Sequence, residues 1–357
     1  MPTESQRSSI FLDAYLLFVF LCCLTIVPAA AAQKIELRVG YQPFSSPTGA
    51  IFEVIKRDRI LKQTLEQQKV ALKFIPFKKG ADSIVAFKRG ELDAVAMGDM
   101  PLLEFALSCP VVIIAQNRQG YSTVVASRGT YPRDLKGKRI GNAFASSGHF
   151  TLLKILQNVG LTEKDVTLVS LDVNEMPDTL LKGKIDAFSV WEPTPSMFMA
   201  KYPERFSSVG RQIGSGYLAV SRPFFYRYPE TVSLFGAGVV RAMEWLKKDR
   251  GNIQKAAAWS KTDISEYSGK PYQVSIEELG RQIEGDLKII QFSARLPALK
   301  ANGKNLLYEE FSFLKAIGRL PQDARWETLR NSFDHSVMER IYRNATFYSV
   351  KRFDYEL

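Results

Sequence analysis

The sequence predicts an α/β fold made of two similar halves, because three features of the chain occur twice. In each half an apolar strand is followed by a turn-rich loop and then by apolar residues at helical spacing. A second strand comes next, and a Gly-x-Leu/Ile-Asp-Ala turn then leads into a third strand. Each half is therefore expected to be a βαβαβ unit, with a mostly parallel sheet flanked by helices.

The first half opens with a predicted strand over 37–40, and residues 41–49 form the loop after it. Helical spacing of apolar residues predicts one helix over 50–61. Residues 70–74 predict the second strand, and the turn at 90–94 leads into the third.

The second half repeats this order, beginning with a strand over 139–141 and a loop over 142–147. A helix over 148–159 and a strand over 166–170 follow. The turn at 183–187 then precedes the third strand, so the whole βαβαβ pattern is predicted twice.

The loops after the two third strands are the first place to expect a ligand. Ligands of parallel α/β sheets bind at the carboxyl ends of the strands, so 98–101 and 191–194 are expected to face one cleft. Asp93 and Asp186 occupy the same place in the two turns, and we interpret both as structural residues that begin a buried strand.

Two further extended segments, 122–125 and 216–220, predict a hinge through which the chain crosses twice. The predicted organisation is a first lobe over 33–122, a second lobe over 123–217 and a return to the first lobe over 218–357. Within the return, the sequence predicts helices over 234–247, 276–292 and 306–317, and a loop over 262–275.

Residues 1–32 are predicted to be a secretory signal peptide. The uninterrupted apolar run at 14–27 would span only about 21 Å as a helix, less than the roughly 30 Å of a bilayer core. Pro28 ends the run, and the small residues before Gln33 place cleavage after Ala32 and the protein in the periplasm. The alternative is an uncleaved membrane anchor, because Arg7 is the only basic residue before the run.

The composition limits the classes of function. With 46% apolar and 24% charged residues, the 357-residue chain is typical of a globular protein, and disorder, collagen and coiled coil are excluded. The net charge of +11 favours anionic partners, but the basic residues are dispersed without a nucleic-acid-binding motif, so no nucleic acid is expected. Three Cys and two His are too few for a zinc or iron–sulfur centre, and neither a metal nor a cofactor is expected.

Four groups of motifs in a fixed order make the chain similar to a known family. They are Val-Gly-Tyr-Gln at 39–42, Phe-Lys-Arg-Gly-Glu-Leu-Asp-Ala at 87–94 with Gly-Asp-Met-Pro at 98–101, Asp-Leu-Lys-Gly-Lys-Arg-Ile-Gly at 134–141 with Ser-Ser-Gly-His at 146–149, and Asp-Ala-Phe-Ser-Val-Trp-Glu-Pro at 186–193. Over roughly residues 35–250 the chain resembles the solute-binding proteins of ABC transporters, in the branch that binds sulfonates, nitrate, taurine and some thiamin-precursor pyrimidines.

This resemblance implies a two-lobed, type II periplasmic-binding-protein fold that closes on a small ligand. A monomer would deliver an anionic or zwitterionic ligand, such as a sulfonate, taurine or nitrate, to an ABC permease in the inner membrane. The family usually has Lys-Gly-Ser-Ser before the His, whereas here Asn142-Ala143-Phe144-Ala145 precede the serines, and the Lys and Gly are missing. A thiamin-precursor pyrimidine as the ligand and a ligand sensor of the same fold stay open as alternatives.

The N-terminus of the helix over 148–159 is the predicted anion site. Ser146 or Ser147 is expected to cap this helix, whose first backbone N–H groups are unpaired and attract negative charge. His149 is expected to be a neutral hydrogen-bond donor, because the helix dipole disfavours its protonation. The alternatives are an ordinary cap without a ligand and a His on the helix surface.

Other candidate contacts come from the loops around the expected cleft. Asp99 is expected to cap a helix over 100–107, and with Glu192 it would prefer the amino group of a zwitterion. Aromatic residues provide flat surfaces for an alkyl or aromatic ligand, with core packing as the alternative for one of them. These aromatic residues are Tyr41, Trp191 and Phe77, and core packing is the alternative for Phe77. The predicted set of ligand contacts also includes Gln42, Gly98, Met100 and Tyr217.

An enzyme is not expected. Ser147 and His149 are too close in sequence to support a nucleophile with an oriented base. The pyrimidine synthases that share this fold carry a clustered Cys motif, and beyond residue 32 this chain has only Cys109.

Overall fold

The computed structural model describes residues 35–291, 293–300 and 305–356, and residues 36–357 form one compact unit. The predicted signal peptide and its cleavage site after Ala32 lie outside the described residues. Within the described part of the chain, no helix has the length and apolar character needed to cross a membrane.

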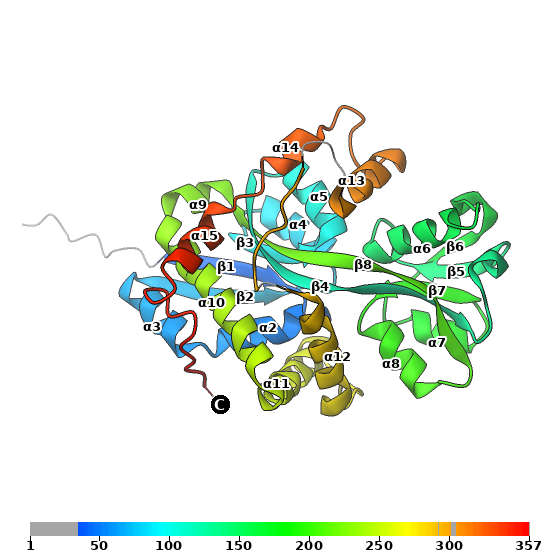
Figure 1. The fold of residues 1–357 in the computed structure, drawn as a ribbon, viewed down its shortest axis with the longest axis horizontal. Helices are drawn as coiled ribbons and strands as arrows, with labels where there is room; N and C mark the ends of the chain where they lie inside the picture. The colour runs from blue at the N-terminus through cyan, green and yellow to red at the C-terminus, as the bar shows by residue number, and fades with distance from the viewer. Residues whose placement is uncertain (1–34, 292, 301–304, 357) are drawn as a thin grey trace, which may run out of the picture. The chain divides into compact units, whose positions relative to one another are not determined.

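One mixed sheet of eight strands runs through the compact unit (Figure 1). Its order is β2-β1-β3-β8-β4-β7-β5-β6, so the strands of the two halves lie at opposite ends and two long strands lie between them. The strands are β1 (Ile35–Tyr41), β2 (Val70–Pro76), β3 (Ala94–Gly98), β4 (Val111–Ser127), β5 (Arg139–Asn142), β6 (Thr167–Ser170), β7 (Ala187–Trp191) and β8 (Phe206–Ser221).

The predicted repeat is confirmed by the order of elements in both halves. The first strand, β1, pairs in parallel with the third strand, β3, and the equivalent strands β5 and β7 pair in the same way. Each half also has helices on both sides of its strands: Figure 1 shows α6 on one side of β5–β7 and α7 and α8 on the other. The sequence therefore predicts the architecture of each half correctly.

The helices and short 3₁₀ segments follow in chain order. The helices are α2 (Thr48–Lys56), α3 (Arg59–Gln67), α4 (Gly80–Lys88), α5 (Asp99–Ser108), α6 (Ser147–Gln157), α7 (Met176–Leu181), α8 (Thr194–Lys201), α9 (Arg222–Arg227), α10 (Pro229–Lys248), α11 (Arg250–Ser268), α12 (Ile276–Ile289), α13 (Leu306–Ala316), α14 (Trp326–Arg330) and α15 (Ser336–Arg343). The 3₁₀ segments are η1 (Pro132–Leu135) and η2 (Glu163–Asp165).

The two long strands join the halves. β4 and β8 pair antiparallel from Val111–Ser221 to Ser127–Phe206, over about 55 Å at 3.3 Å per residue. One end of β8 also pairs with β3, and the opposite end of β4 pairs with β7. The sequence predicts only short extended segments at 122–125 and 216–220, because a strand that is buried in one half and then crosses to the other has no single repeating pattern along its length.

Two predicted elements differ from the structure, and each difference has a local cause. The single helix over 50–61 is two helices, because the buried carboxylate of Asp58 accepts the backbone N–H of Leu61 at 2.9 Å and starts α3 anew. The predicted loop over 262–275 is wrong in its first half, since α11 continues to Ser268 and ends at Gly269, which has a left-handed φ of 66°.

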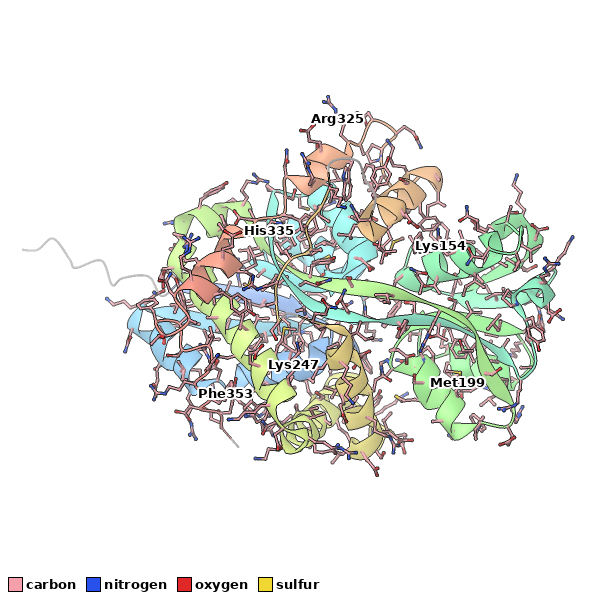
Figure 2. The ribbon with its side chains drawn as sticks, in the orientation of Figure 1. Lys154, Met199, Lys247, Arg325, His335 and Phe353 are labelled. Carbon is pink, nitrogen blue, oxygen red and sulfur yellow. The ribbon has the colours of Figure 1, made fainter. Side chains whose placement is uncertain are left out.

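Three apolar clusters of the described residues form part of the core. One packs α5, α13 and α14 against β3, β4 and β8, and the two others lie on opposite sides of the strands of the second half. The C-terminal segment also reaches the second half, since Nζ of Lys154 on α6 lies 2.9 Å from a carboxylate oxygen of Glu309 on α13 (Figure 2). The division into lobes at 122/123 and 217/218 stays a prediction.

Candidate ligand-binding site

Two adjoining cavities lie where the loops of both halves meet. The first has a volume of about 250 Å³ and the second about 100 Å³. They share the lining residues Gln42, Ser45, Lys79 and Trp191. Because these four residues come from both halves of the chain, the two cavities form one site between the halves.

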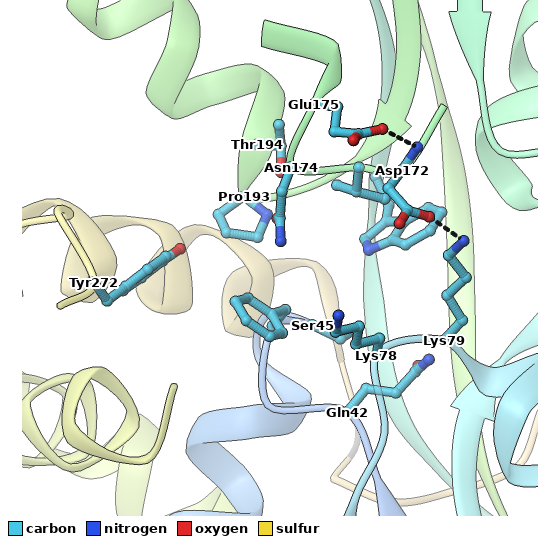
Figure 3. A pocket seen from close by; sticks show the side chains of 13 residues that line it. Gln42, Ser45, Lys78, Lys79, Asp172, Asn174, Glu175, Pro193, Thr194 and Tyr272 are labelled. Carbon is cyan, nitrogen blue, oxygen red and sulfur yellow. Dashed lines mark hydrogen bonds and ion pairs between the residues drawn. The ribbon is translucent and has the colours of Figure 1, made fainter. Parts of the chain in front are cut away.

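The larger cavity is lined by residues that follow strands, as the sequence predicts (Figure 3). Its walls come from the ends of β1, β2, β6 and β7 and from the loop between α11 and α12. The ion pair of Lys79 with Asp172 joins the loop after β2 to the loop after β6. The lining residues beyond the four shared ones are Phe44, Lys78, Asp172, Val173, Asn174, Glu175, Pro193, Thr194 and Tyr272.

The smaller cavity is lined by the start of α6, which confirms the predicted cap. The Ser146 hydroxyl accepts the backbone N–H of His149 at 3.3 Å, and the Ser147 hydroxyl lies 3.1 Å from that of Ser122. Gly148 lets this turn lie on β7, because a Cβ there would be 2.6 Å from the backbone oxygen of Ser189. Both serines line the cavity, so the unpaired N–H groups of the first turn lie at its wall.

The residues before the serines have an unusual conformation for their type. Ala145 has a left-handed φ of 56°, which favours glycine, and it stands directly before Ser146. Phe144 also lines the smaller cavity, and 52% of its surface is exposed although its ring centre is 5.0 Å from that of His149. The missing Lys and Gly of the family pattern are thus replaced by an exposed aromatic ring and a strained alanine.

Arg118 is the buried cation of the site, and the sequence analysis missed it. Only 3% of the residue is exposed, and it lines the smaller cavity from the middle of β4. Its Nε donates to the backbone oxygen of Ser46 at 2.9 Å, whereas its Nη2 has no hydrogen-bond partner among the described residues. The available signal was an arginine three residues after the apolar run at 111–115, because a charge within a buried strand needs a partner.

Several buried carboxyl groups surround Arg118. Burial raises the pKa of Asp99 and of Glu192 above the ordinary range, and it raises that of Asp286 to about 7. The positive charge of Arg118 opposes the effect of burial at all three groups. Glu310, buried on α13 beside Asp99, has its pKa raised further by burial and by the Asp99 charge. The site is therefore mixed in charge, with one guanidinium among carboxyl groups that hold protons easily.

Asp99 and Glu192 have structural partners in this arrangement. Asp99 lines the smaller cavity, and its carboxylate accepts the backbone N–H groups of Met100 at 2.9 Å and Ser215 at 2.5 Å. It is the first residue of α5 and not the predicted cap, which is Gly98. Glu192 does not line either cavity, and its carboxylate accepts the backbone N–H of Ser196 at 3.1 Å in the first turn of α8.

The predicted aromatic contacts separate into two groups. Trp191 lines both cavities. Tyr41 is 1% exposed, stacks on Phe52 with ring centres 5.1 Å apart, and donates its hydroxyl to Asp263 at 2.8 Å. Tyr217 is buried against Phe333. Both tyrosines are buried in the core and line neither cavity. Their role as ligand contacts stays a prediction.

The remaining predicted residues are also divided between wall and core. Gln42 and Gly98 line the cavities, whereas Met100 belongs to the apolar cluster around α5 and Phe77 packs against it. His149 is fully buried, its Nδ1 accepts the backbone N–H of Ala145 at 3.2 Å, and burial lowers its pKa to about 4. Burial therefore favours the neutral ring, as predicted for a different reason, and the role of His149 as a hydrogen-bond donor to a ligand stays a prediction.

Cavity residues that the sequence analysis missed come from segments without a motif. Phe44, Lys79 and Tyr272 lie in loops, and only the position of Lys78-Lys79 directly after a strand could have indicated a site. Among the described residues, no group of His, Cys, Asp and Glu is arranged to hold a metal ion.

Comparison with known proteins identifies a family model and relatives that the chain resembles. Residues 31–261, more than half of the chain, match the model of the NMT1-like family. A taurine-binding periplasmic protein of Escherichia coli (strain K12) is 27% identical over 249 residues, which cover 65% of this chain and 75% of that protein.

Solved structures share the fold at lower identity. The alkanesulfonate-binding protein SsuA from Xanthomonas axonopodis pv. citri, bound to MOPS, has a TM-score of 0.62 at 19% identity, covering 85% of this chain and 99% of that one. The desulfurization enzyme DszB has a TM-score of 0.60 at 14% identity, covering 87% of this chain and 100% of that one. At these identities the two structures show a common fold and do not decide between binding and catalysis.

Proposed function

The chain belongs to the NMT1-like family, and from this premise we propose that it is a periplasmic solute-binding protein of an ABC import system. In this proposal a monomer captures a small anionic or zwitterionic ligand, such as a sulfonate, taurine or a nitrate-like ion, and delivers it to a permease in the inner membrane. The E. coli relative, named as a taurine-binding periplasmic protein, supports ligand binding without chemistry.

The observation that carries the proposal is that Arg118, whose Nη2 is unpaired among the described residues, lines the same cavity as the first turn of α6. Both line the smaller cavity, and an oxoanion there would accept from the guanidinium and from backbone N–H groups. Each charge-assisted hydrogen bond contributes about 1.5–3 kcal/mol, so three or four are enough for micromolar affinity, about −8 kcal/mol.

Capture would use the two long strands as the hinge. β4 and β8 are the strands that link the two halves, and their pairing has register shifts between Gln116 and Arg118 and between Val124 and Val125. The ion pair between Lys79 and Asp172 already links the loops of the two halves across the larger cavity. A bound ligand that contacts both halves would favour the closed arrangement over an open one.

Calorimetric titration of the refolded protein tests the proposal. Refolding removes any ligand carried from the host, and taurine, alkanesulfonates, nitrate, bicarbonate and aminopyrimidines are then titrated in turn. We expect micromolar or tighter binding of an anion or zwitterion, and a loss of at least about tenfold in Arg118→Gln. Arg128→Gln is the matched control, because Arg128 lies outside both cavities and donates to the backbone of Pro203. No binding of any compound by a folded sample would contradict the proposal.

A further inference from the structure

The two cavities differ in size and in chemistry, which limits the shape of a ligand that fills both. Their volumes of about 250 Å³ and about 100 Å³ together fall near the lower end of the roughly 300–1,000 Å³ typical of organic-ligand sites. A two-carbon zwitterion or a bare inorganic ion would leave the larger cavity unfilled. The shared wall residue Trp191 lies at the connection between them.

The smaller cavity has a guanidinium and helix N-termini that attract an oxoanion, together with the carboxyl group of Asp99, whose pKa is raised by burial. Arg118 is 97% buried and lines this cavity, and its Nη2 has no hydrogen-bond partner among the described residues, which is costly unless a partner of opposite charge completes the site. The first turns of α4 and α6 contribute Gly80 and Ser147 to the same wall, and helix N-termini attract negative charge. The volume of this cavity restricts the anion to a compact group.

Three aromatic side chains lie among the mostly polar residues that line the larger cavity. Phe44 and Tyr272 meet edge to face with ring centres 6.2 Å apart, and the indole of Trp191 is on the opposite half of the chain. All three line the cavity and are only partly buried, so part of each side chain is available to a ligand. Phe144 adds a fourth exposed ring on the wall of the smaller cavity. Aromatic rings prefer offset-stacked or edge-to-face contact with a further ring.

Resting on the function proposed above, we propose that the ligand of this site has two parts: a compact oxoanion head held at Arg118, and a flat aromatic body held between Phe44, Trp191 and Tyr272. The head is a sulfonate or a carboxylate, since both present two or more oxygens to a guanidinium. The aromatic body fills the larger cavity and contacts both halves of the chain, so it adds to the affinity and to closure. Size and aromatic character, and not charge alone, therefore decide which anions are captured.

Calorimetry with two matched pairs of compounds tests the proposal on the refolded full chain. The pairs are benzenesulfonate with methanesulfonate, and benzoate with acetate, so each pair has one head group and differs only in the body. We expect the aryl member of at least one pair to bind at least about tenfold tighter, the ratio given by about 1.4 kcal/mol. The pair that shows the tighter aryl binding identifies the head group as sulfonate or carboxylate.

Two variants separate the aromatic walls from the anion site. Phe44→Ala and Tyr272→Ala, whose side chains line only the larger of the two cavities, are expected to bring the aryl-to-methyl ratio toward one while the binding of the methyl compound changes by less than about twofold. Tyr131→Ala is the matched control, because Tyr131 is 71% exposed and lies outside both cavities. Circular dichroism shows that each variant is folded.

The outcomes distinguish this inference from the proposed function. Equal affinity for the methyl and aryl members of both pairs, or a ratio that survives both aromatic substitutions, would overturn the aromatic body and leave anion capture intact. If a folded sample binds none of these compounds and none of the small ions and zwitterions tested above, both the function and the inference are wrong.

Discussion

The guanidinium of Arg139 holds the carboxylate of Asp186 through Nε at 3.0 Å and Nη2 at 2.8 Å, and the backbone N–H of Arg139 donates to the same carboxylate at 2.8 Å. Arg38 and Asp93 repeat this arrangement in the first half, with distances of 2.8, 2.9 and 2.9 Å. The aspartate of each Gly-x-Leu/Ile-Asp-Ala turn therefore ties the start of the third strand to the first strand. This agrees with the structural interpretation of Asp93 and Asp186.

Asp186→Asn is expected to lower stability in a pH-dependent way. Arg139 holds the pKa of Asp186 at about 2, so the carboxylate stabilises the fold above its unfolded pKa near 3.9, and this contribution is lost as the pH falls toward 2. The pair is partly exposed, and we expect a loss of about 0.5–1 kcal/mol at pH 7. Denaturant unfolding at pH 7 and pH 2 measures it, with exposed Asp323→Asn as the control. A difference that is as large at pH 2 as at pH 7 would contradict the assignment.

The same Gly→Ala substitution is expected to have opposite effects at two helical positions. At Gly148 the new Cβ would lie 2.6 Å from the backbone oxygen of Ser189, and moving α6 off β7 is expected to cost about 1–3 kcal/mol. At Gly285, inside α12, a Cβ meets no atom within 4 Å, and alanine is expected to stabilise by about 0.5–1 kcal/mol. Thermal or denaturant unfolding of both variants checks the signs, and a neutral Gly148→Ala would mean that the helix moves without cost.

The sequence predicts the elements whose pattern is local. The strands and helices of the two halves repeat in order, and the cap at Ser146 follows from residue types within one turn. The break between α2 and α3 was missed because Asp58 is buried and paired with Arg241, a residue 183 positions away. An aspartate in the sequence does not by itself indicate a distant arginine as its partner.

The same limit applies to the site. Trp191, Asp99 and the two serines were found because each lies at the end of a predicted strand or the start of a predicted helix. Arg118 was not found, because it reaches the cavity only through the pairing of β4 with β8, where Gly216 leaves room for its side chain. Strand pairing over a hundred residues is set by packing and not by local pattern.

Breaking the buried pair of Arg241 with Asp58 is expected to destabilise the protein strongly. The two side chains are 3% and 1% exposed, with Nη2 and the carboxylate 2.7 Å apart, so Arg241→Met leaves Asp58 buried beside no charge. We expect a loss of about 3–5 kcal/mol in the free energy of unfolding. Arg59→Met, which removes an exposed pair with Asp354, is the matched control and is expected to cost at most about 1 kcal/mol. Equal losses in the two variants would show that burial of the pair is irrelevant.

Anion affinity is expected to fall as the pH rises from 6 to 8, through Asp286. This carboxyl on α12 interacts electrostatically with Arg118 and Glu192, and burial raises its pKa to about 7. Its raised pKa means that the folded protein holds a proton that the unfolded chain loses near pH 3.9, so stability also declines as the pH rises through 7. Once ionised, Asp286 competes with a bound oxoanion for Arg118. If the protein with ionised Asp286 does not bind the ligand, the affinity falls by up to about tenfold between pH 6 and pH 8.

Calorimetry at pH 6, 7 and 8 in buffers of different ionisation enthalpy measures both the affinity and the protons taken up on binding. Asp286→Asn is expected to abolish most of the pH dependence, and to bind at pH 8 as the unaltered protein binds at pH 6. Asp323→Asn, on the exposed surface, is expected to keep the full dependence. Glu192, Asp99 and Glu310 also have raised pKa values and lie around the same guanidinium or beside Asp99. If the affinity of Asp286→Asn still falls with rising pH, the titrating group is one of these three carboxyl groups and not Asp286.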